Sequence, residues 1–411
     1  MSAIEAALRE DRLVAAHAAS AETVRRTPVL TSAGLSRRCG GTVAFKAECL
    51  QRTGSFKLRG ALNKLRAIAA GDAPIRAVVA GSAGNHGQSL AYAARRRGVP
   101  CEVFMPVGAP LGKVEAVRAL GAAVHQKGDS VDACVAQARE RAAAEGFAFV
   151  HPFDDLEVIA GQAGIGVEIA ADVPDARLVL VPIGGGGLAS GVAAALKQAR
   201  PEVEVVGVQA AACAPVAAAL AGGGAETPAA LATIADGIAV KHPGAITLPL
   251  IERWVDRVVT VDEDAIAAAM TLLLDHSKLV VEGAGAASLA ALVSGAVAPS
   301  ESGTTVAVLS GGNVDIGMLA SIAAHMETEA GRRGRLFTRI VDRPGNLARL
   351  LAAVAEAGAN VIAVEHVRDG VALGVSETGV VLTIETRGES HLQRVGQRLR
   401  GAGYRLDESL D

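Results

Sequence analysis

The alternation of short aliphatic runs with alanine-rich stretches of helical length constrains the fold of this chain most strongly. The runs that we expect to form strands cover residues 43–48, 77–81, 101–105, 123–126, 178–183, 203–209 and 305–309. The expected helices between them include residues 87–97, 113–120, 130–145 and 190–199. Several runs are apolar without alternation, which is typical of parallel strands that helices cover on both faces. The pattern predicts an α/β architecture with mostly parallel sheets.

The residues after position 331 follow a different pattern. A basic Gly-Arg-Arg-Gly linker at 331–334 precedes a strand, a helix, two strands, a helix and a short final strand. We expect these elements at residues 335–341, 346–358, 361–368, 380–387, 390–400 and near Tyr404. This βαββα(β) order predicts a small ferredoxin-like α+β unit, with a boundary near residue 331.

The charge balance and the scarcity of aromatic residues exclude several classes of partner. The 40 basic and 43 acidic residues give a net charge of −3, so no basic excess is available to neutralise nucleic-acid phosphates. Aromatic residues make up 2% of the chain, which argues against a surface on which bases would stack. No apolar run approaches the roughly 20 residues that span a bilayer, so we expect no membrane partner.

Cysteine usage and the N-terminus favour a cytoplasmic location. The five cysteines are odd in number, scattered, and form no Cys-x-x-Cys pair. This usage is typical of reduced thiols and predicts neither a disulfide framework nor a zinc site. Residues 1–20 lack a basic start followed by an apolar core, so we expect no secretory signal.

Five short motifs carry the candidate chemistry. Lys57 lies in the stretch Gly-Ser-Phe-Lys-Leu-Arg-Gly at 54–60, just after an expected strand. By itself this is a weak signal, because a lysine beside glycine is usually a solvated loop residue. The segment at 81–88, Gly-Ser-Ala-Gly-Asn-His-Gly-Gln, opens a helix whose exposed N–H groups favour an anion such as a carboxylate.

The four glycines at 184–187 also lie between an expected strand and helix, where the backbone could wrap closely around a phosphate. They lack the Gly-Lys-Ser/Thr ending of a nucleotide P-loop and the spacing of a dinucleotide site. The remaining motifs, Glu-Gly-Ala-Gly-Ala at 282–286 and Ser-Gly-Gly-Asn at 310–313, could each be a plain connection. Together the five predict a pyridoxal phosphate (PLP) pocket with a lysine for the aldehyde and a glycine cradle for the phosphate.

The order SFKLRGA, SAGNHGQ, PIGGGGLASG, EGAGA, SGGN resembles the serine/threonine dehydratase family of fold type II PLP enzymes. The resemblance implies a two-lobed, tryptophan synthase β-like fold, with a large PLP-binding lobe at 1–50 and 152–330 and a small lobe at 51–151. The tail, with DRPGN at 342–346 and GANVI at 358–362, resembles an ACT domain at 335–411. A dehydratase followed by one ACT unit is the arrangement of the shorter threonine ammonia-lyases.

The resemblance also assigns roles to individual residues. It makes Lys57 the Schiff-base lysine, which also removes the substrate Cα proton. It implies that the cofactor is held by Phe56, Lys57, Asn85, Gly184, Gly185, Gly186, Gly187, Leu188 and Ser310. It implies that the substrate carboxylate is bound by Ser82, Ala83, Gly84, Asn85 and His86. We expect His86 to order its loop rather than to transfer protons.

The implied reaction is β-elimination from L-threonine, giving 2-oxobutanoate and ammonia, with L-serine giving pyruvate. A serine racemase on the same scaffold is an alternative, but related racemases carry a second-face serine where this chain has Ala83. A hydroxyaspartate ammonia-lyase would need an extra cation for the second carboxylate, and Arg59 stays open for that role. A non-catalytic amino-acid sensor is a third possibility, against which the intact Lys57 weighs. The preference for threonine or serine stays open.

The family also suggests how the enzyme is regulated and which ions it lacks. Relatives with a divalent-metal site carry an acidic cluster where this chain has Gln209 and Cys213, so we expect no such metal, although a monovalent cation held by carbonyls stays open. The ACT-like tail would bind an amino-acid effector, isoleucine by pathway logic, near Asn346 and Leu347. Alternatively, the tail only promotes oligomerisation. The family implies a homodimer or homotetramer.

Overall fold

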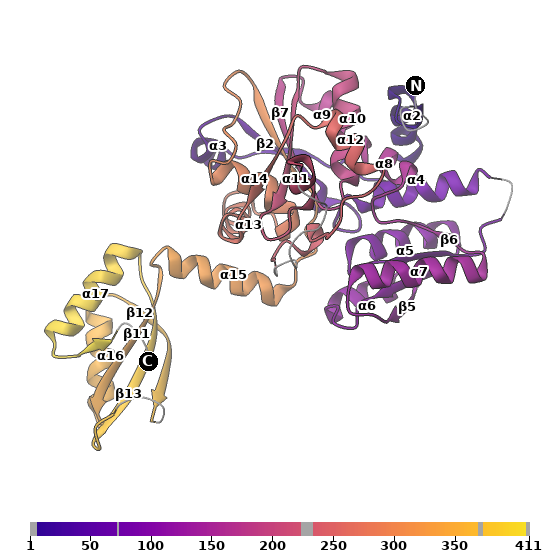
Figure 1. Cartoon of the computed structure of the whole chain (residues 1–411). Helices are drawn as coiled ribbons and strands as arrows, with labels where there is room; N and C mark the ends of the chain where they lie inside the picture. The colour runs from indigo at the N-terminus through magenta and orange to yellow at the C-terminus, as the bar shows by residue number, and fades with distance from the viewer. Residues whose placement is uncertain (1–5, 72–73, 223–232, 369–372, 408–411) are drawn as a thin grey trace. The chain divides into compact units, whose positions relative to one another are not determined.

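The computed structural model describes residues 6–71, 74–222, 233–368 and 373–407. It divides into two compact units, Met1–Asp315 and Ile316–Asp411 (Figure 1). Helix α15 (Ile316–Glu329) therefore belongs to the second unit, ahead of the expected boundary near residue 331. Strand β11 begins at Arg333, which pairs with Glu385, so the last two residues of the expected linker belong to a sheet.

The first unit contains a six-stranded sheet of order β1-β2-β10-β7-β8-β9. All neighbours in it are parallel except β1 and β2. Its strands are β1 (Val29–Thr31), β2 (Val43–Ala47), β7 (Ala176–Pro182), β8 (Glu204–Ala210), β9 (Arg257–Val261) and β10 (Thr304–Leu309). Every residue of β2 and β10 is buried, because helices cover both faces. The predicted α/β class with parallel sheets is confirmed.

A second, four-stranded parallel sheet of order β5-β4-β3-β6 lies in the same unit. Its strands are β3 (Val78–Gly81), β4 (Cys101–Met105), β5 (Ala123–Gln126) and β6 (Ala148–Phe149). The helices that accompany it are α4 (Lys57–Ala69), α5 (Asn85–Arg97), α6 (Leu111–Ala119) and α7 (Val131–Glu145). A separate aliphatic core, including Leu65, Leu90 and Val103, lies between this sheet and its helices.

The other helices of the first unit accompany the six-stranded sheet or flank it. They are α2 (Glu10–Ser20), α3 (Ala33–Cys39), α8 (Leu156–Gln162), α9 (Gly164–Asp172), α10 (Gly187–Ala199), α11 (Pro215–Leu220), α12 (Thr247–Trp254), α13 (Glu263–Ser277) and α14 (Gly283–Val293), with short 3₁₀ turns η1 (Glu48–Leu50) and η2 (Asp236–Ile238). A side chain just before the first turn fixes where several of these helices begin. Asp155, for example, accepts the N–H groups of Glu157 and Val158 and so starts α8.

The second unit holds the antiparallel sheet β12-β13-β11-β14, covered by helices α16 (Asn346–Glu356) and α17 (Glu389–Gly401). The strands are β11 (Arg333–Val341), β12 (Asn360–Val367), β13 (Glu377–Glu385) and β14 (Leu406–Asp407). Leu350, Val354, Leu382 and Leu399 belong to its own core. The predicted βαββαβ order is confirmed, including the short last strand.

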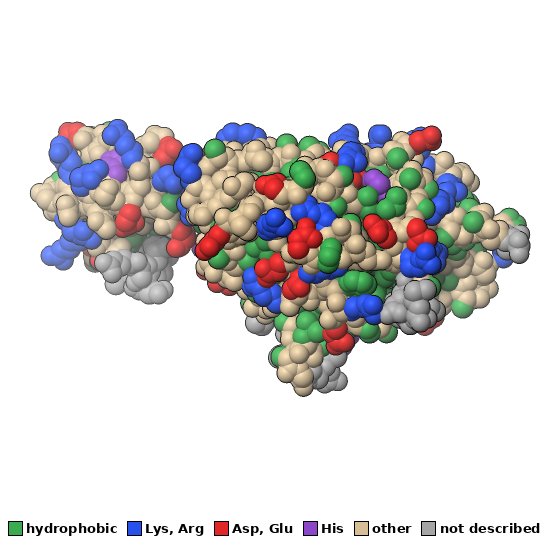
Figure 2. All heavy atoms as spheres, turned by 90° about the horizontal axis from the view of Figure 1, so that it is seen from above, with side chains coloured by type: hydrophobic (Ala, Val, Ile, Leu, Met, Phe, Trp, Pro, Cys, Tyr) green, Lys and Arg blue, Asp and Glu red, His purple; other side chains and the backbone are tan. Residues whose placement is uncertain are grey.

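Charged side chains of both signs are interspersed over the face drawn in Figure 2, as the small net charge would suggest. Among the described residues, no helix is both long enough and apolar enough to cross a membrane.

Candidate functional site

One cavity of the first unit gathers the residues singled out in the five motifs. The expected cofactor and substrate residues that line it are Phe56, Lys57, Ser82, Ala83, Gly84, Asn85, His86, Gly184, Gly185, Gly186, Gly187, Leu188 and Ser310. They come from the segments that follow β2, β3, β7 and β10. The carboxyl ends of parallel strands meet at one edge of a sheet, and this brings motifs distant in sequence together.

Lys57 is the first residue of α4 and faces this cavity. Its Nζ donates a hydrogen bond to the Pro152 carbonyl oxygen at 2.8 Å and lies 5.1 Å from the centre of the Phe56 ring. Removal from solvent lowers the Lys57 pKa to about 8, and the nearby Glu282 carboxylate partly opposes that shift. A lysine with such a pKa is a better nucleophile near neutral pH than an ordinary lysine, because a larger fraction of its amine is neutral.

The glycine run forms a tight turn between β7 and α10. Gly186 has φ +96°, and a Cβ on Gly185 would lie 2.4 Å from the Phe153 ring. The Thr247 hydroxyl donates to the Gly185 carbonyl oxygen at 2.5 Å and so holds the turn from the other side. The first N–H groups of α10 have no partner within the helix, so they are available to an anion.

The N-terminus of α5 also faces the cavity, and hydrogen bonds within its loop hold it in place. Ser82 Oγ accepts hydrogen bonds from the backbone N–H groups of Gly84 at 3.1 Å and Gly87 at 3.0 Å. His86 Nε2 lies 3.0 Å from the Val150 carbonyl oxygen, and burial lowers the His86 pKa to about 3. The buried His86 ring thus joins the start of α5 to the end of the loop that carries Val150.

Asn85 belongs to a chain of amide contacts that ends on Glu282. Its Nδ2 donates to Glu282 Oε1 at 2.7 Å, and its Oδ1 accepts from Asn313 Nδ2 at 2.7 Å. Burial raises the Glu282 pKa to about 7, and the charge of Asp236 adds to this. Glu282 lines the cavity, although no role was assigned to it from the sequence, where its motif could have been a plain connection. One sequence signal could have pointed to Glu282, because it is the only acidic residue of the five motifs.

Ser310 closes the cavity at the end of β10. Its backbone oxygen accepts from the Phe56 N–H at 3.0 Å, which joins this strand end to the start of α4. Its hydroxyl donates only a long hydrogen bond, of 3.5 Å, to the Ala284 carbonyl oxygen. This neutral hydroxyl is therefore well placed to turn toward a ligand in the cavity.

The loop after β6 supports the glycine run and the start of α12 through hydrogen bonds of His151 and Asp154. His151 Nδ1 accepts the N–H groups of Phe153 at 3.3 Å and Asp154 at 2.7 Å. Asp154 accepts in turn from the N–H groups of Ile246 at 2.8 Å and Thr247 at 3.2 Å. Through these bonds the loop holds both Phe153, beneath the glycine run, and the start of α12.

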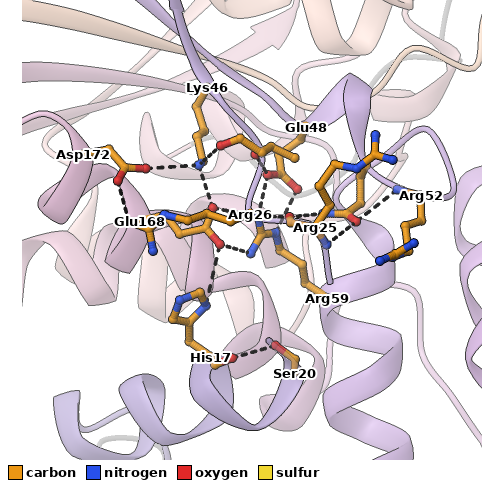
Figure 3. Close-up of polar contacts among 12 residues, drawn as sticks. His17, Ser20, Arg25, Arg26, Lys46, Glu48, Arg52, Arg59, Glu168 and Asp172 are labelled. Atoms are coloured by element: carbon orange, nitrogen blue, oxygen red, sulfur yellow. Dashed lines mark hydrogen bonds and ion pairs between the residues drawn. The ribbon is translucent and has the colours of Figure 1, made fainter. Parts of the chain in front are cut away.

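Arg59 does not reach the cavity. It lies in a buried cluster with Glu48, Glu168 and Lys46, drawn in Figure 3. Its guanidinium contacts Glu48 at 2.7 and 2.8 Å and Glu168 at 2.8 and 2.9 Å, while Lys46 Nζ is 2.6 Å from Glu168. Arg59 is therefore engaged by two carboxylates, which removes it as the extra cation for a second substrate carboxylate.

The lining residues fit PLP on two independent observations. The turn at Gly185 leaves no room for a side chain and directs a helix N-terminus at the cavity, as a phosphate requires. Lys57 supplies an amine of lowered pKa for an aldehyde. Among the described residues, no group of three or more His, Cys, Asp or Glu side chains could hold a metal ion.

Comparison with known proteins defines the class to which this fold and site belong. A family model described as "Pyridoxal-phosphate dependent enzyme" matches residues 21–311, and the chain belongs to this family. The predicted family, fold type II architecture and PLP dependence are thereby confirmed.

Individual relatives narrow the class further. The L-threonine ammonia-lyase of Geobacter sulfurreducens is 44% identical over 384 residues, which cover 93% of this chain and 95% of that protein. The crystal structure of a threonine deaminase from T.th. has a TM-score of 0.69 and 40% identity, and covers 74% of this chain and 98% of that chain. A crystal structure of a PLP-dependent aspartate racemase has a TM-score of 0.71 and 34% identity. It covers 75% of this chain and 96% of that chain.

Proposed function

We propose that this protein is an L-threonine ammonia-lyase that converts L-threonine to 2-oxobutanoate and ammonia and also accepts L-serine. The observation that carries the proposal is Lys57, an amine of lowered pKa that shares one cavity with the glycine run and the α5 N-terminus. The similarity to the Geobacter sulfurreducens enzyme over 93% of the chain supports this substrate.

When bound, PLP supplies the electron sink that stabilises a carbanion at the substrate Cα. The residues of the chain do the rest. Lys57 Nζ takes the Cα proton, and the N-terminus of α5 orients the substrate carboxylate. The Ser310 hydroxyl would serve the pyridine nitrogen as a neutral partner, which suits elimination better than transamination. The glycine run would hold the phosphate and so fix the position of the cofactor in the cavity.

Racemisation on this scaffold is disfavoured by the second face of the cavity. A racemase needs an acid or base on both faces of Cα. Ala83 lines the cavity at the position where related racemases carry a serine, and its methyl group cannot transfer a proton. A purely sensory role is disfavoured by the enclosed, poorly solvated amine of Lys57.

The proposal is tested by replacing Lys57. Lys57→Ala should abolish the visible absorption of lysine-bound PLP and lower 2-oxobutanoate release by at least about 10³-fold, because both nucleophile and base are lost. The matched control is Lys64→Ala on the same helix, whose Nζ pairs with Asp155 at 2.5 Å and does not line the cavity. Full activity of Lys57→Ala, or no activity of the wild-type enzyme on threonine or serine, would refute the assignment.

We further propose that the second unit binds an amino-acid effector such as isoleucine. Leu347 lines a small hollow with Ile340, Arg343, His366 and Thr378, which offers apolar and polar walls to an amino acid. Asn346, the other expected effector residue, does not line this hollow. Its side chain instead bonds to the Val341 carbonyl oxygen at 2.7 Å and holds the loop.

Calorimetric titration of the full-length enzyme with isoleucine and valine tests this second proposal. Heat of binding together with a changed rate on threonine would support sensing. No heat and no change in rate would leave the unit a role in oligomerisation alone. We also expect a homodimer or homotetramer, which light scattering would measure, and a cytoplasmic location, in keeping with five free cysteines.

A further inference from the structure

An ion pair at the rim of the cavity has no part in the chemistry proposed above. Lys113 Nζ lies 2.5 Å from Asp236 Oδ2. Lys113 belongs to α6, beside the four-stranded sheet, and Asp236 to η2, which precedes β9 of the six-stranded sheet. The pair therefore connects opposite walls of the cavity across 123 residues of sequence.

Both charges act inside the cavity. The Lys113 stem lies against the start of α5, because a Cβ on Gly84 would be 3.2 Å from Lys113 Cδ. On the other side, a Cβ on Gly237 would be 3.7 Å from Glu282 Oε1, so η2 packs against that carboxylate. Besides burial, which raises the Glu282 pKa most, Asp236 raises it and Lys113 lowers it.

Lys113 is the cation that a substrate side chain could meet. The described lining residues include two lysines and no arginine, and Lys57 is committed to the cofactor. Arg59, the cation suggested by the sequence, is held by two buried glutamates. The side chain of Lys113 is 16% exposed and that of Asp236 is 48% exposed, so Asp236 lies on the solvent side of the pair.

We propose that Asp236 restricts this enzyme to amino acids with uncharged side chains, because it neutralises Lys113. An unpaired Lys113 would attract a second carboxylate, as in aspartate or 3-hydroxyaspartate, whereas the paired lysine requires that carboxylate to compete with Asp236. Substrate specificity then arises because Lys113 is already paired with Asp236, and not from the shape of the cavity. The inference rests on the proposed function and names the determinant of its substrate class.

The test compares two ligands of nearly equal size that differ in charge. The holoenzyme is titrated with L-aspartate and with L-asparagine, and binding is followed by the change in cofactor absorption. In Asp236→Asn, the ratio of the aspartate Kd to the asparagine Kd should fall about tenfold, because the lysine charge is released. Adding Lys113→Met should abolish that fall. Lys113→Met alone should raise the ratio, because Asp236 then repels aspartate.

The matched control is Asp256→Asn, which breaks a comparable ion pair away from the cavity. Lys197 Nζ lies 2.6 Å from Asp256, and the two side chains are 15% and 39% exposed. The Kd ratio of this variant should equal that of the wild type. An unchanged ratio in Asp236→Asn, or a fall that persists without Lys113, would overturn the inference.

The two proposals fail separately in this design. Binding is read from the cofactor spectrum, so it needs no turnover of threonine. A wild-type enzyme without keto-acid release would count against the proposed reaction only. If Asp236→Asn failed to hold the cofactor, Lys113→Met alone would still decide the question, since an unchanged or lower ratio there contradicts the role of Lys113.

Discussion

At the scale of single residues, the site depends on two titratable groups held away from their ordinary pKa values. The pKa of Lys57 is lowered to about 8 and that of Glu282 is raised to about 7, and burial is the main cause of both shifts. Burial disfavours the charged form of either group. Near neutral pH the cavity therefore holds a partly neutral amine beside a partly neutral acid, and the neutral amine is the form that can accept a proton.

The Lys57 pKa predicts the pH dependence of cofactor capture. Only the neutral amine attacks an aldehyde, so the rate at which the apoenzyme gains PLP absorption should rise with pH, with a midpoint near 8 rather than near 10.5. Glu282→Gln removes the charge that raises the Lys57 pKa, so the midpoint should move to lower pH. Stopped-flow absorption from about pH 6 to about pH 10 measures it.

A control distinguishes this local effect from a change in overall charge. Glu115→Gln removes an exposed carboxylate from α6 and should leave the midpoint where it is in the wild type. A midpoint near 10.5 in the wild type, or a shift to higher pH in Glu282→Gln, would contradict the proposed coupling.

At the scale of elements, the start of α4 is fixed by the buried charge cluster on its other face. Arg59 follows Lys57 by two residues and joins η1, through Glu48, to α9, through Glu168. Arg59 counteracts the effect of burial on Glu48 and keeps its pKa below the ordinary value. The two buried cations, Arg59 and Lys46, balance the two buried carboxylates, so the net charge of this cluster is close to zero.

Removing one member of the cluster should be costly. Arg59→Met leaves Glu48 without its cation and should lower the free energy of unfolding by about 3–5 kcal/mol. Adding Glu48→Met should recover part of that loss, because Lys46 and Glu168 then remain as a balanced pair. Urea unfolding of the apoenzyme measures both variants.

An exposed ion pair supplies the comparison. Arg257 and Glu204 lie 2.8 Å apart with side chains 43% and 44% exposed, so Arg257→Met should cost at most about 1 kcal/mol. Equal losses for Arg59→Met and Arg257→Met would show that the buried cluster contributes no more than a surface pair.

At the scale of the whole molecule, each of the two units has its own hydrophobic cores. The catalytic cavity is lined entirely by residues of the first unit, and the hollow beside Leu347 entirely by residues of the second. The threonine deaminase from T.th. matches 74% of this chain over 98% of its own length, so a protein of that name exists at about the size of the first unit.

This division predicts that catalysis survives removal of the second unit. A chain that ends at Asp315 should keep the PLP absorption and release 2-oxobutanoate, while its response to isoleucine should disappear. Absorption spectra, keto-acid assays and titration calorimetry measure these properties. A response to isoleucine that persists in the truncated chain would place the effector site in the first unit.

Local sequence patterns were sufficient to predict most of the helices and strands. The strands expected at 101–105 and 123–126 have those bounds. Residues 101–105 form a mostly apolar, largely buried run between turns, which specifies a strand, whereas no residue of β5 is fully buried. β1, β6 and β9 were not predicted. β1 and β6 are only three and two residues long, and β9 lies at the sheet edge with only Val261 fully buried, so none of them produces a strong hydrophobic run.

By itself, the sequence determined the fold class, the order of the five motifs and the residue types that can hold PLP, because these depend on short-range pattern and backbone geometry. Only the tertiary structure decided that Arg59 faces two glutamates rather than the substrate, and that Glu282 and Asp236 face the cavity. The physical reason is that charge pairing acts through space. Lys113 and Asp236 are 123 residues apart in the chain, and their contact exists only once both sheets have formed.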